Sequence, residues 1–290
     1  MTTIGITGAS GELGRAATDH VLRANPDTDL VLLTRNPEAL TGSRSAGSVR
    51  IRHADFDAPE ELPAAFDDID VLLLISTDAV GRRAAQHRAA IAAAAKAGVA
   101  RVVYTSATNP HVAHPVELAP LMRDHAETEA ALQAAGMSWT ILRNALYLDA
   151  FAPVWAQSAA TGTLVSNNGT GRHAPVARDD CAAAAAAALT TAGHDNATYN
   201  ISGAQLIDDE TLAALLSTAY GRTVEVVAVS DQEYAAGLQE AGLPPAVADP
   251  IVGFGASIRG GLLEAPLGDT ERLIGRAPIS VEAFLSPAGA

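Results

Sequence analysis

The sequence predicts an α/β fold in which helices cover both faces of a parallel sheet. Over the first 145 residues, short apolar runs rich in β-branched residues alternate with helix-length amphipathic runs. This alternation is typical of parallel strands joined by crossover helices. The first strand-like run also leads directly into a glycine-rich turn and a helix. We therefore expect a doubly wound parallel sheet, followed by a small α+β C-terminal domain.

Six runs in the first part of the chain have the composition of buried parallel strands, which are apolar on both faces. They occupy residues 2–7, 30–34, 48–52, 71–76, 101–106 and 138–143. The helix-length runs between them cover residues 12–24, 59–67, 81–97 and 119–136. The last two reach Gly98 and Gly136, and glycine is preferred just past a helix end. This order predicts a nucleotide-binding sheet domain over residues 1–147.

From residue 148 onward the pattern is less regular. Gly and Asn turns in residues 161–177 predict a loop or a hairpin. A helix is expected from about Asp179 and another over 208–221, which Asp208 or Asp209 caps. Strands are expected at 197–203 and 223–230, before a tail rich in Gly and Pro. We expect residues 148–290 to form a substrate or lid domain over the carboxyl edge of the sheet, an arrangement that permits segment exchange with the first domain.

The charge and the cysteine count narrow the function classes. A net charge of -14 disfavours nucleic acid and anionic lipid as partners, and no apolar run reaches the roughly 18 residues of a membrane span. Cys181 is the only cysteine, so no internal disulfide or thiolate metal site can form. With a first strand too close to Met1 for a leader peptide, we expect a cytoplasmic protein. His111 and His114 have a spacing compatible with a metal, but a solvated lid loop is favoured and no metal is expected.

Three glycines, Gly8, Gly11 and Gly14, stand three apart between the first strand and the first helix. In a dinucleotide-binding turn such glycines allow the tight turn, the approach of a pyrophosphate and close helix packing. The amides at the start of the helix then bind phosphate. The sequence predicts that this corner binds a dinucleotide, together with the intervening residues Ala9, Ser10, Glu12 and Leu13.

The end of the second strand predicts which dinucleotide is bound. An NAD-binding site usually has an acidic residue here, which binds the ribose 2′-hydroxyl. No acid lies between Leu30 and Pro37, and Arg35 stands there instead. A guanidinium forms charge-assisted hydrogen bonds with a 2′-phosphate. We therefore predict NADPH (NADP) in preference to NADH; the alternative is that Arg35 is an ordinary solvated arginine.

Later strand ends lead to the same crevice. Asp55 and Phe56 follow the third strand, where the adenine should lie, although core packing is the alternative for them. Ser76 and Thr77 end the fourth strand, within reach of the sugars and pyrophosphate.

The succession of these motifs resembles a known family. GITGASGELG, LTRNP, LLLISTDAVGRRAAQH, YTSA, DHAETEAAL, ILRNALY, NISG and RLIGRAPISVEAF follow one another over nearly the whole chain. They resemble NmrA-like atypical short-chain dehydrogenases, in particular bacterial type-two NAD(P)H:quinone oxidoreductases. The resemblance implies a Rossmann-type domain, a small C-terminal domain, NADPH and a quinone acceptor. It also implies cofactor contacts from Gly8 through Leu13, Arg35, Ser76, Thr77, Asn144, Ala145, Leu146 and Tyr147.

The sequence lacks the proton-transfer pair of typical short-chain dehydrogenases, Tyr-x-x-x-Lys. Lys96 is the only lysine, and Ala92 stands four residues before it. In the matching helix the chain has His125 and Glu129, and a carboxylate raises the pKa of a neighbouring acid rather than lowering it. Alcohol–ketone chemistry is therefore not expected, and neither is an isoflavone-reductase-like activity, which also needs a lysine.

Reduction of a quinone needs no such pair, because the site only has to hold two rings together. We expect Asn144 to bind the nicotinamide amide or a quinone oxygen, and Tyr147 to stack or donate its hydroxyl. A strand-end cap and core filling are their respective alternatives. His125 is the one candidate proton donor, with a helix-surface histidine as the alternative, and Val176 is expected near the nicotinamide.

Two functions agree with these features. The first is NADPH-dependent hydride transfer to a quinone or a similar electron-poor small molecule, mainly by positioning. The second is a regulatory protein of NmrA type that senses NADP(H) and binds it without catalysis. Two helices with long alanine faces also suggest a homodimer.

Overall fold

A seven-stranded parallel sheet forms the centre of the computed structural model, which describes residues 2–40 and 49–286. The strand order is β3-β2-β1-β4-β5-β6-β8. Order reverses between β1 and β4, and in such sheets the ligand crevice lies at the carboxyl ends near this point. The strands are β1 (Thr3–Thr7), β2 (Asp29–Thr34), β3 (Val49–His53), β4 (Val71–Leu74), β5 (Arg101–Ala107), β6 (Ser138–Asn144) and β8 (Ala197–Ile201).

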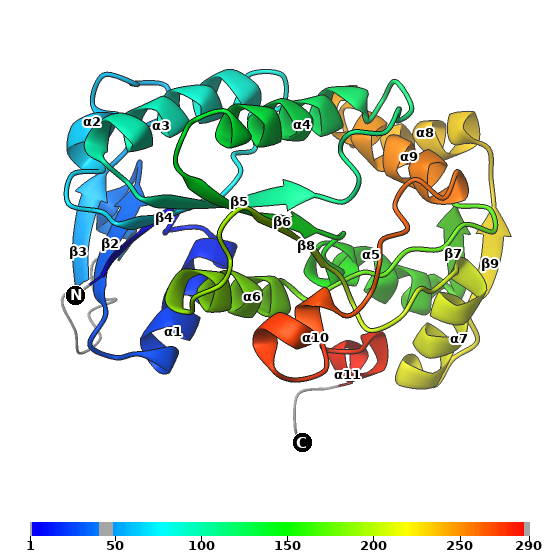
Figure 1. Cartoon of the computed structure of the whole chain (residues 1–290). Helices are drawn as coiled ribbons and strands as arrows, with labels where there is room; N and C mark the ends of the chain where they lie inside the picture. The colour runs from blue at the N-terminus through cyan, green and yellow to red at the C-terminus, as the bar shows by residue number, and fades with distance from the viewer. Residues whose placement is uncertain (1, 41–48, 287–290) are drawn as a thin grey trace.

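Helices cover both faces of this sheet (Figure 1). On one face lie α1 (Glu12–Ala24), α6 (Arg178–Thr190) and α10 (Asp269–Ile274). On the other lie α2 (Leu62–Ala65), α3 (Arg83–Ala97) and α4 (Ala119–Gln133), and a short 3₁₀ turn, η1, spans Pro37–Leu40. Within β2, Leu30 and Leu32 join one apolar cluster while Val31 and Leu33 join the other. The strands are apolar throughout because each buries both of its faces.

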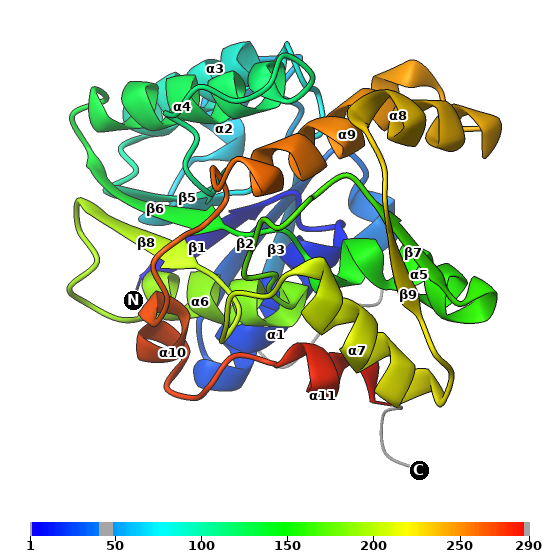
Figure 2. The same ribbon diagram turned by 90° about the vertical axis from the view of Figure 1, so that its right-hand side faces the viewer.

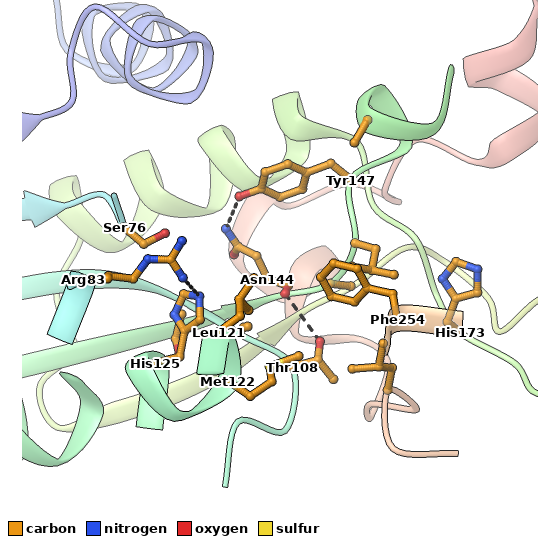
Figure 3. A pocket seen from close by; sticks show the side chains of 16 residues that line it. Ser76, Arg83, Thr108, Leu121, Met122, His125, Asn144, Tyr147, His173 and Phe254 are labelled. Atoms are coloured by element: carbon orange, nitrogen blue, oxygen red, sulfur yellow. Dashed lines mark hydrogen bonds between the residues drawn. The ribbon is translucent and has the colours of Figure 1, made fainter. Parts of the chain in front are cut away.

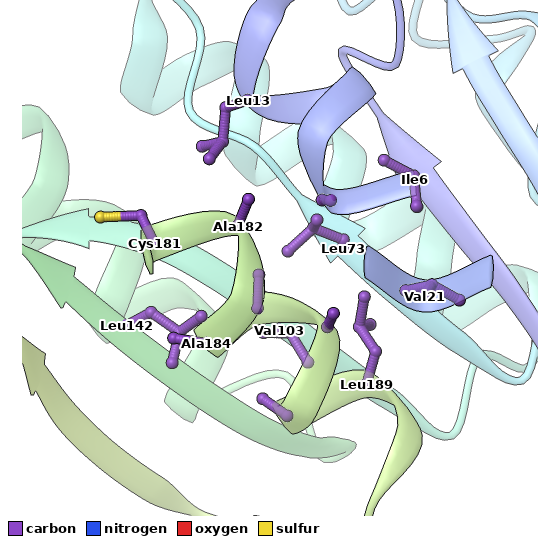
Figure 4. Packing of buried hydrophobic residues seen from close by; sticks show 14 of the residues in the cluster. Ile6, Leu13, Val21, Leu73, Val103, Leu142, Cys181, Ala182, Ala184 and Leu189 are labelled. Atoms are coloured by element: carbon purple, nitrogen blue, oxygen red, sulfur yellow. The ribbon is translucent and has the colours of Figure 1, made fainter. Parts of the chain in front are cut away.

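The alanine-rich helix α6 packs against α1 and the sheet (Figure 4). Its alanines 182, 184, 185, 186 and 188 are buried inside this cluster, and so is Cys181. The small side chains let the helix lie close to its neighbours. In α3, Ala90 and Ala94 are buried in the second cluster in the same way. The alanine faces of α6 and α3 are therefore buried within the chain and give no support to a homodimer. A homodimer stays a prediction.

The rest of the C-terminal half surrounds a two-stranded sheet of β7 (Thr163–Ser166) and β9 (Glu225–Ala228). These strands are parallel, so the hairpin reading of residues 161–177 was wrong. Asp208 caps α7 as predicted, because its side chain accepts a hydrogen bond from the Thr211 amide. Figure 2 shows α8 and α9 on one side of this sheet and α7 with α11 on the other. The helices are α5 (Leu148–Thr161), α7 (Asp209–Tyr220), α8 (Asp231–Glu240), α9 (Pro245–Arg259) and α11 (Val281–Leu285).

The two halves of the chain share the main sheet. Both α6 and β8 follow residue 147, yet α6 covers one face of the sheet and β8 forms its edge. Arg178, at the start of α6, forms ion pairs with Glu12 of α1 and Asp149 of α5 at 2.6 and 3.3 Å. A domain boundary at residue 147 stays a prediction. Two segments of the second half, α6 and β8, belong structurally to the main sheet and its helical cover. Within the described residues, none of the helices is long and apolar enough to cross a membrane.

Candidate functional site

The glycine turn between β1 and α1 has the geometry that its sequence predicts. Gly8 has φ of +61°, a region that side chains disfavour. A Cβ on Gly14 would lie 2.3 Å from the Gly8 carbonyl oxygen and 2.7 Å from the Ala9 Cα. Gly11 is the N-cap residue of α1, and no side chain caps the helix. The amides of the first helical turn, from Glu12 onward, are therefore left for a ligand such as a pyrophosphate.

Hydrogen bonds hold this corner against the second strand. The Ala9 amide donates to the Leu33 carbonyl at 3.1 Å, and the Ser10 and Thr34 hydroxyls share a hydrogen bond of 2.8 Å. Arg35 follows Thr34 directly. Its side chain is exposed, and within residues 2–40 and 49–286 it has no hydrogen bond or ion pair. This position suits a 2′-phosphate, and contact with one stays a prediction.

Arg15 is a second guanidinium at the same corner. Its Nε donates to the Ser10 carbonyl at 2.9 Å and its Nη2 to the Ala39 carbonyl at 2.8 Å. Arg15 thus joins the glycine turn to the segment after β2. Sequence reasoning did not single it out, because nothing in an amphipathic helix distinguishes one exposed arginine from another.

Asp55 and Phe56 follow β3, at the expected edge of the sheet. The Asp55 carboxylate accepts a hydrogen bond from the Asp57 amide at 3.0 Å. Phe56 packs against the second apolar cluster and meets the His87 ring edge-on at 6.3 Å. In the protein without a ligand, Phe56 therefore packs in the core, which was the alternative for this residue. A contact with an adenine stays a prediction for Asp55 and Phe56.

Ser76 and Thr77 lie after β4 but face different ways. Ser76 lines a cavity at the edge of the sheet. The Thr77 hydroxyl instead donates to Gln86 at 2.8 Å, and the Thr77 amide donates to His87 Nε2 at 3.2 Å. Of the pair, Ser76 is thus the residue that can touch a ligand in the cavity with its side chain.

This cavity, of about 290 Å³, lies at the carboxyl ends of the central strands (Figure 3). One part of its wall is apolar and is formed by Leu121, Met122, Leu146, Phe254 and Leu263. The other part carries polar side chains, namely Ser76, Arg83, Ser106, Thr108, His125 and Asn144. An apolar pocket with a few placed polar groups is typical of a small-molecule site.

Asn144 and Tyr147 both line this cavity, and their predicted contacts with a nicotinamide or an acceptor stay predictions. Asn144 is 7% exposed, and its Nδ2 donates to the Tyr147 hydroxyl at 3.0 Å. The Asn144 Oδ1 is buried without a hydrogen-bond partner among the described residues. Such an atom is costly unless a bound molecule donates to it. Burial raises the pKa of Tyr147, so its hydroxyl keeps its proton.

Backbone pairing fixes the segment that carries these residues. The Val176 amide donates to the Leu146 carbonyl at 3.0 Å, and the Leu148 amide donates to the Val176 carbonyl at 2.9 Å. The Ala145 amide donates to Ile201 of β8. Ala145 and Leu146 line the cavity, whereas Val176 is buried behind them and is not part of its wall.

His125 lies in the cavity wall as a buried and neutral residue. It is 6% exposed, so the helix-surface alternative was wrong. Arg83 can only donate, so the 3.1 Å contact from its Nη1 makes His125 Nε2 an acceptor. The ring proton then lies on Nδ1, which donates to the Tyr104 hydroxyl at 2.7 Å. Burial, and then Arg83 and His87, hold the pKa of His125 well below its usual value. No ring proton of His125 faces the cavity, which gives no support to a role as proton donor.

Glu129 lies four residues after His125 on α4, and its carboxylate is buried. Burial raises the pKa of this carboxyl, but hydrogen bonds from Arg143, Ser106 and His111 outweigh it, and the pKa is lowered. The shortest of them runs from the Ser106 hydroxyl, at 2.6 Å. His111 was expected in a solvated loop; its half-exposed side chain contacts Glu129 at 2.7 Å. Glu129 is therefore a charged anchor for surrounding residues and not a proton donor.

Several wall residues were missed by sequence reasoning. Phe254 and Leu263 come from the Gly- and Pro-rich tail, and only the tertiary fold brings them to the sheet edge. His173 lies in the segment expected to be a loop, and its Nδ1 is buried without a partner in the described part of the chain. Burial lowers the pKa of His173 to about 4. Arg83 stands in one of the quoted motifs, but the letters do not distinguish it from Arg82 beside it.

Comparison with known proteins agrees with this geometry. A family profile described as NAD(P)H-binding matches residues 8–192. Quinone oxidoreductase 2 of Escherichia coli is 35% identical over 263 residues, which cover 90% of each chain. An NmrA-like family oxidoreductase of Aspergillus flavus is 30% identical over 281 residues, covering 94% of this chain and 91% of that protein.

A crystal structure of the NADPH-dependent quinone oxidoreductase of Escherichia coli, complexed with NADPH, has the same fold. It superposes with a TM-score of 0.92 at 31% identity, over 97% of this chain and 98% of that one. The glycine corner, the seven-stranded parallel sheet and these matches place the chain in one family: it belongs to the NAD(P)H-binding, NmrA-like atypical short-chain dehydrogenases.

Proposed function

We propose that this protein is an NADPH-dependent reductase of quinones or similar electron-poor small molecules. One observation carries the proposal: Asn144 lines a mainly apolar cavity at the carboxyl edge of the sheet, and its buried Oδ1 has no hydrogen-bond partner among the described residues. The relative named quinone oxidoreductase 2, and the related structure complexed with NADPH, support the same assignment.

The residues present fit this cofactor. At Gly14 there is no room for a Cβ, and glycine therefore allows α1 to begin in close contact with the turn. The amides at the start of α1 can then bind a pyrophosphate. Arg35 is positioned to bind a 2′-phosphate by charge-assisted hydrogen bonds. Asn144 Oδ1 needs a donor, and the carboxamide of a nicotinamide ring supplies one. When bound, this cofactor supplies the hydride.

In this proposal the protein acts mainly by positioning. Asn144 and Tyr147 orient one ring, and the apolar wall of Leu121, Leu146 and Phe254 holds the second ring and excludes water. The acceptor gains one hydride and one proton. Tyr147 has a raised pKa and the one ring proton of His125 is donated to Tyr104, so water supplies the proton.

The rival function is an NADP(H) sensor. It also agrees with the finding that Tyr147 and His125, among the described residues that line the cavity, are poor proton donors. Both functions require binding of the cofactor at the same corner. They differ in whether an acceptor oxidises it in the cavity.

Mixing the purified protein with NADPH and a simple benzoquinone tests the proposal. We expect the absorbance band of the reduced nicotinamide to disappear, with one NADPH consumed for each quinone. A Phe254→Asp variant, which puts a charge in the apolar wall, should retain NADPH binding and lose turnover. Tight NADPH binding without any loss of absorbance in the unmodified protein would refute the reductase and favour the sensor.

A further inference from the structure

Arg83 places a buried positive charge in the cavity wall. It is 6% exposed and comes from the first turn of α3. Its Nε donates to the Thr77 carbonyl and its Nη1 to His125. It forms no ion pair with any carboxylate in residues 2–40 and 49–286, and its Nη2 has no hydrogen-bond partner there. Figure 3 shows the guanidinium between Ser76 and His125.

The neighbours of Arg83 hold the guanidinium without neutralising it. His125 accepts from Nη1 and is held in turn by the Tyr104 hydroxyl. His87, Tyr104, Asp124 and Asp78 lie around this network. Of these two carboxylates, Asp124 accepts a hydrogen bond from the Gly81 amide at 2.7 Å. A guanidinium keeps its proton even when buried, so the cavity contains a cation with an unused donor.

A buried charge that no ion pair within the described residues neutralises is costly to a fold, and such charges persist at sites where a ligand completes them. The rest of this cavity offers apolar side chains and neutral donors. The negative end of a bound molecule would therefore be drawn to Arg83. Arg82, the preceding residue, shows the contrast, because it is exposed and pairs with Asp57 at 3.4 Å.

We propose that Arg83 is a catalytic residue that binds the acceptor oxygen on which negative charge develops. The proposal rests on the reductase function above and adds to it an electrophilic group. Bound NADPH would supply the hydride that converts the quinone into a hydroquinone monoanion, with NADP⁺ as the other product. Arg83 Nη2 donates to the new oxyanion, which then takes one proton from water. Positioned donors of this kind lower the barrier because they meet charge as it forms.

A phenol that changes colour on ionisation, 4-nitrophenol, tests this without cofactor. Its phenolate has the ring, oxygen and charge of the reduced acceptor. We expect the wild-type protein to bind the phenolate in preference to the phenol and to lower the apparent pKa of the bound probe by about 1–3 units. Arg83→Gln should bind phenolate about 10- to 100-fold more weakly. Arg83→Lys should recover part of the loss, and Arg82→Gln should behave as wild type.

Steady-state kinetics give the second readout. Arg83→Gln should lower kcat for benzoquinone by about 100-fold, with an unchanged Kd for NADPH. Thermal unfolding of each variant checks that the fold is intact.

The outcomes separate this inference from the proposed function. Equal phenolate binding by wild type and Arg83→Gln, or none by either, overturns the role of Arg83 even if the enzyme reduces quinones. A loss of NADPH affinity equal to the loss of kcat also overturns it, because Arg83 would then serve the cofactor. Phenolate binding that depends on Arg83, in a protein that never oxidises NADPH, retains the anion site and rejects the reductase.

Discussion

We expect Arg35 to decide the choice between two cofactors that differ by one phosphate group. Its exposed guanidinium has no partner in the described part of the chain, so no internal contact is lost when the side chain is removed. We expect Arg35→Ala to weaken NADPH binding by about 1.5–3 kcal/mol, or roughly 10- to 150-fold, the usual range for a hydrogen bond to a charged group. NADH binding should change less than about twofold. Fluorescence titration of both cofactors measures this.

Arg123→Ala is a matched control, because Arg123 is an exposed arginine on α4 far along the chain from the glycine corner. It should leave both affinities unchanged. Equal losses of NADPH and NADH affinity in Arg35→Ala would contradict the assignment.

Single residues were predictable from the sequence where the backbone dictates them. Gly8, Gly14 and Asn144 follow from a strand that enters a tight turn or ends at the sheet edge. His125 was harder, because a histidine on an amphipathic helix gives no sign of being buried. Arg83 could not be distinguished from Arg82 in the sequence, because both are arginines at the start of the same helix. Only the packing of α3 on α4 buries Arg83 and leaves Arg82 exposed.

At the scale of elements, the sequence predicts strands better than helix lengths. All six predicted strands of the first half are present, because a strand buried on both faces must be apolar throughout. The helix predicted over 59–67 is reduced to Leu62–Ala65, one turn beside the buried Phe66. The predicted end of α4 at Gly136 is also late, since the helix ends at Gln133. The pairing of β7 with β9 could not be predicted, since it joins segments about sixty residues apart.

The contact between α1 and the glycine turn makes a sharp test of packing between elements. In Gly14→Ala the new methyl would meet three backbone atoms that cannot rotate away, so α1 must shift. We expect a loss of about 1–3 kcal/mol in the free energy of unfolding. NADPH affinity should fall at least tenfold, because the amides that bind phosphate move with the helix.

Gly237→Ala serves as the control within the same chain. Gly237 lies inside α8, and a Cβ there meets nothing within 4 Å. Alanine should raise stability by about 0.5–1 kcal/mol through its helix propensity and leave cofactor binding unchanged. Denaturation by urea measures both variants, and similar effects of the two substitutions would refute the packing account.

For the whole molecule, three buried histidines link stability to pH. Burial, with Arg83 nearby, lowers the pKa of His87 from 6.5 to about 3. Burial lowers that of His173 to about 4, and the pKa of His125 is also lowered. Each histidine stays neutral in the folded protein, while the unfolded chain takes up protons below about pH 6.5. Stability is therefore full above that pH and falls as the pH drops toward 4.

Between about pH 6.5 and pH 4, each of these histidines should lower the free energy of unfolding by up to about 1.4 kcal/mol for each unit that the pH falls. Urea unfolding between pH 7.5 and about pH 5 measures the total. His173→Gln should remove one such contribution, since its Nδ1 has no described partner to lose. An unchanged slope in His173→Gln would contradict the burial account.

The position of α6 also has a consequence for synthesis on the ribosome. Strands β1 to β6 are made before residue 145, but the helix that covers one of their faces beside α1 spans Arg178–Thr190, and edge strand β8 comes later still. A nascent chain that stops at residue 147 exposes apolar side chains such as Leu142 and Val103 to water. Such a fragment should aggregate when expressed alone and become soluble when the remaining residues are supplied as a second polypeptide.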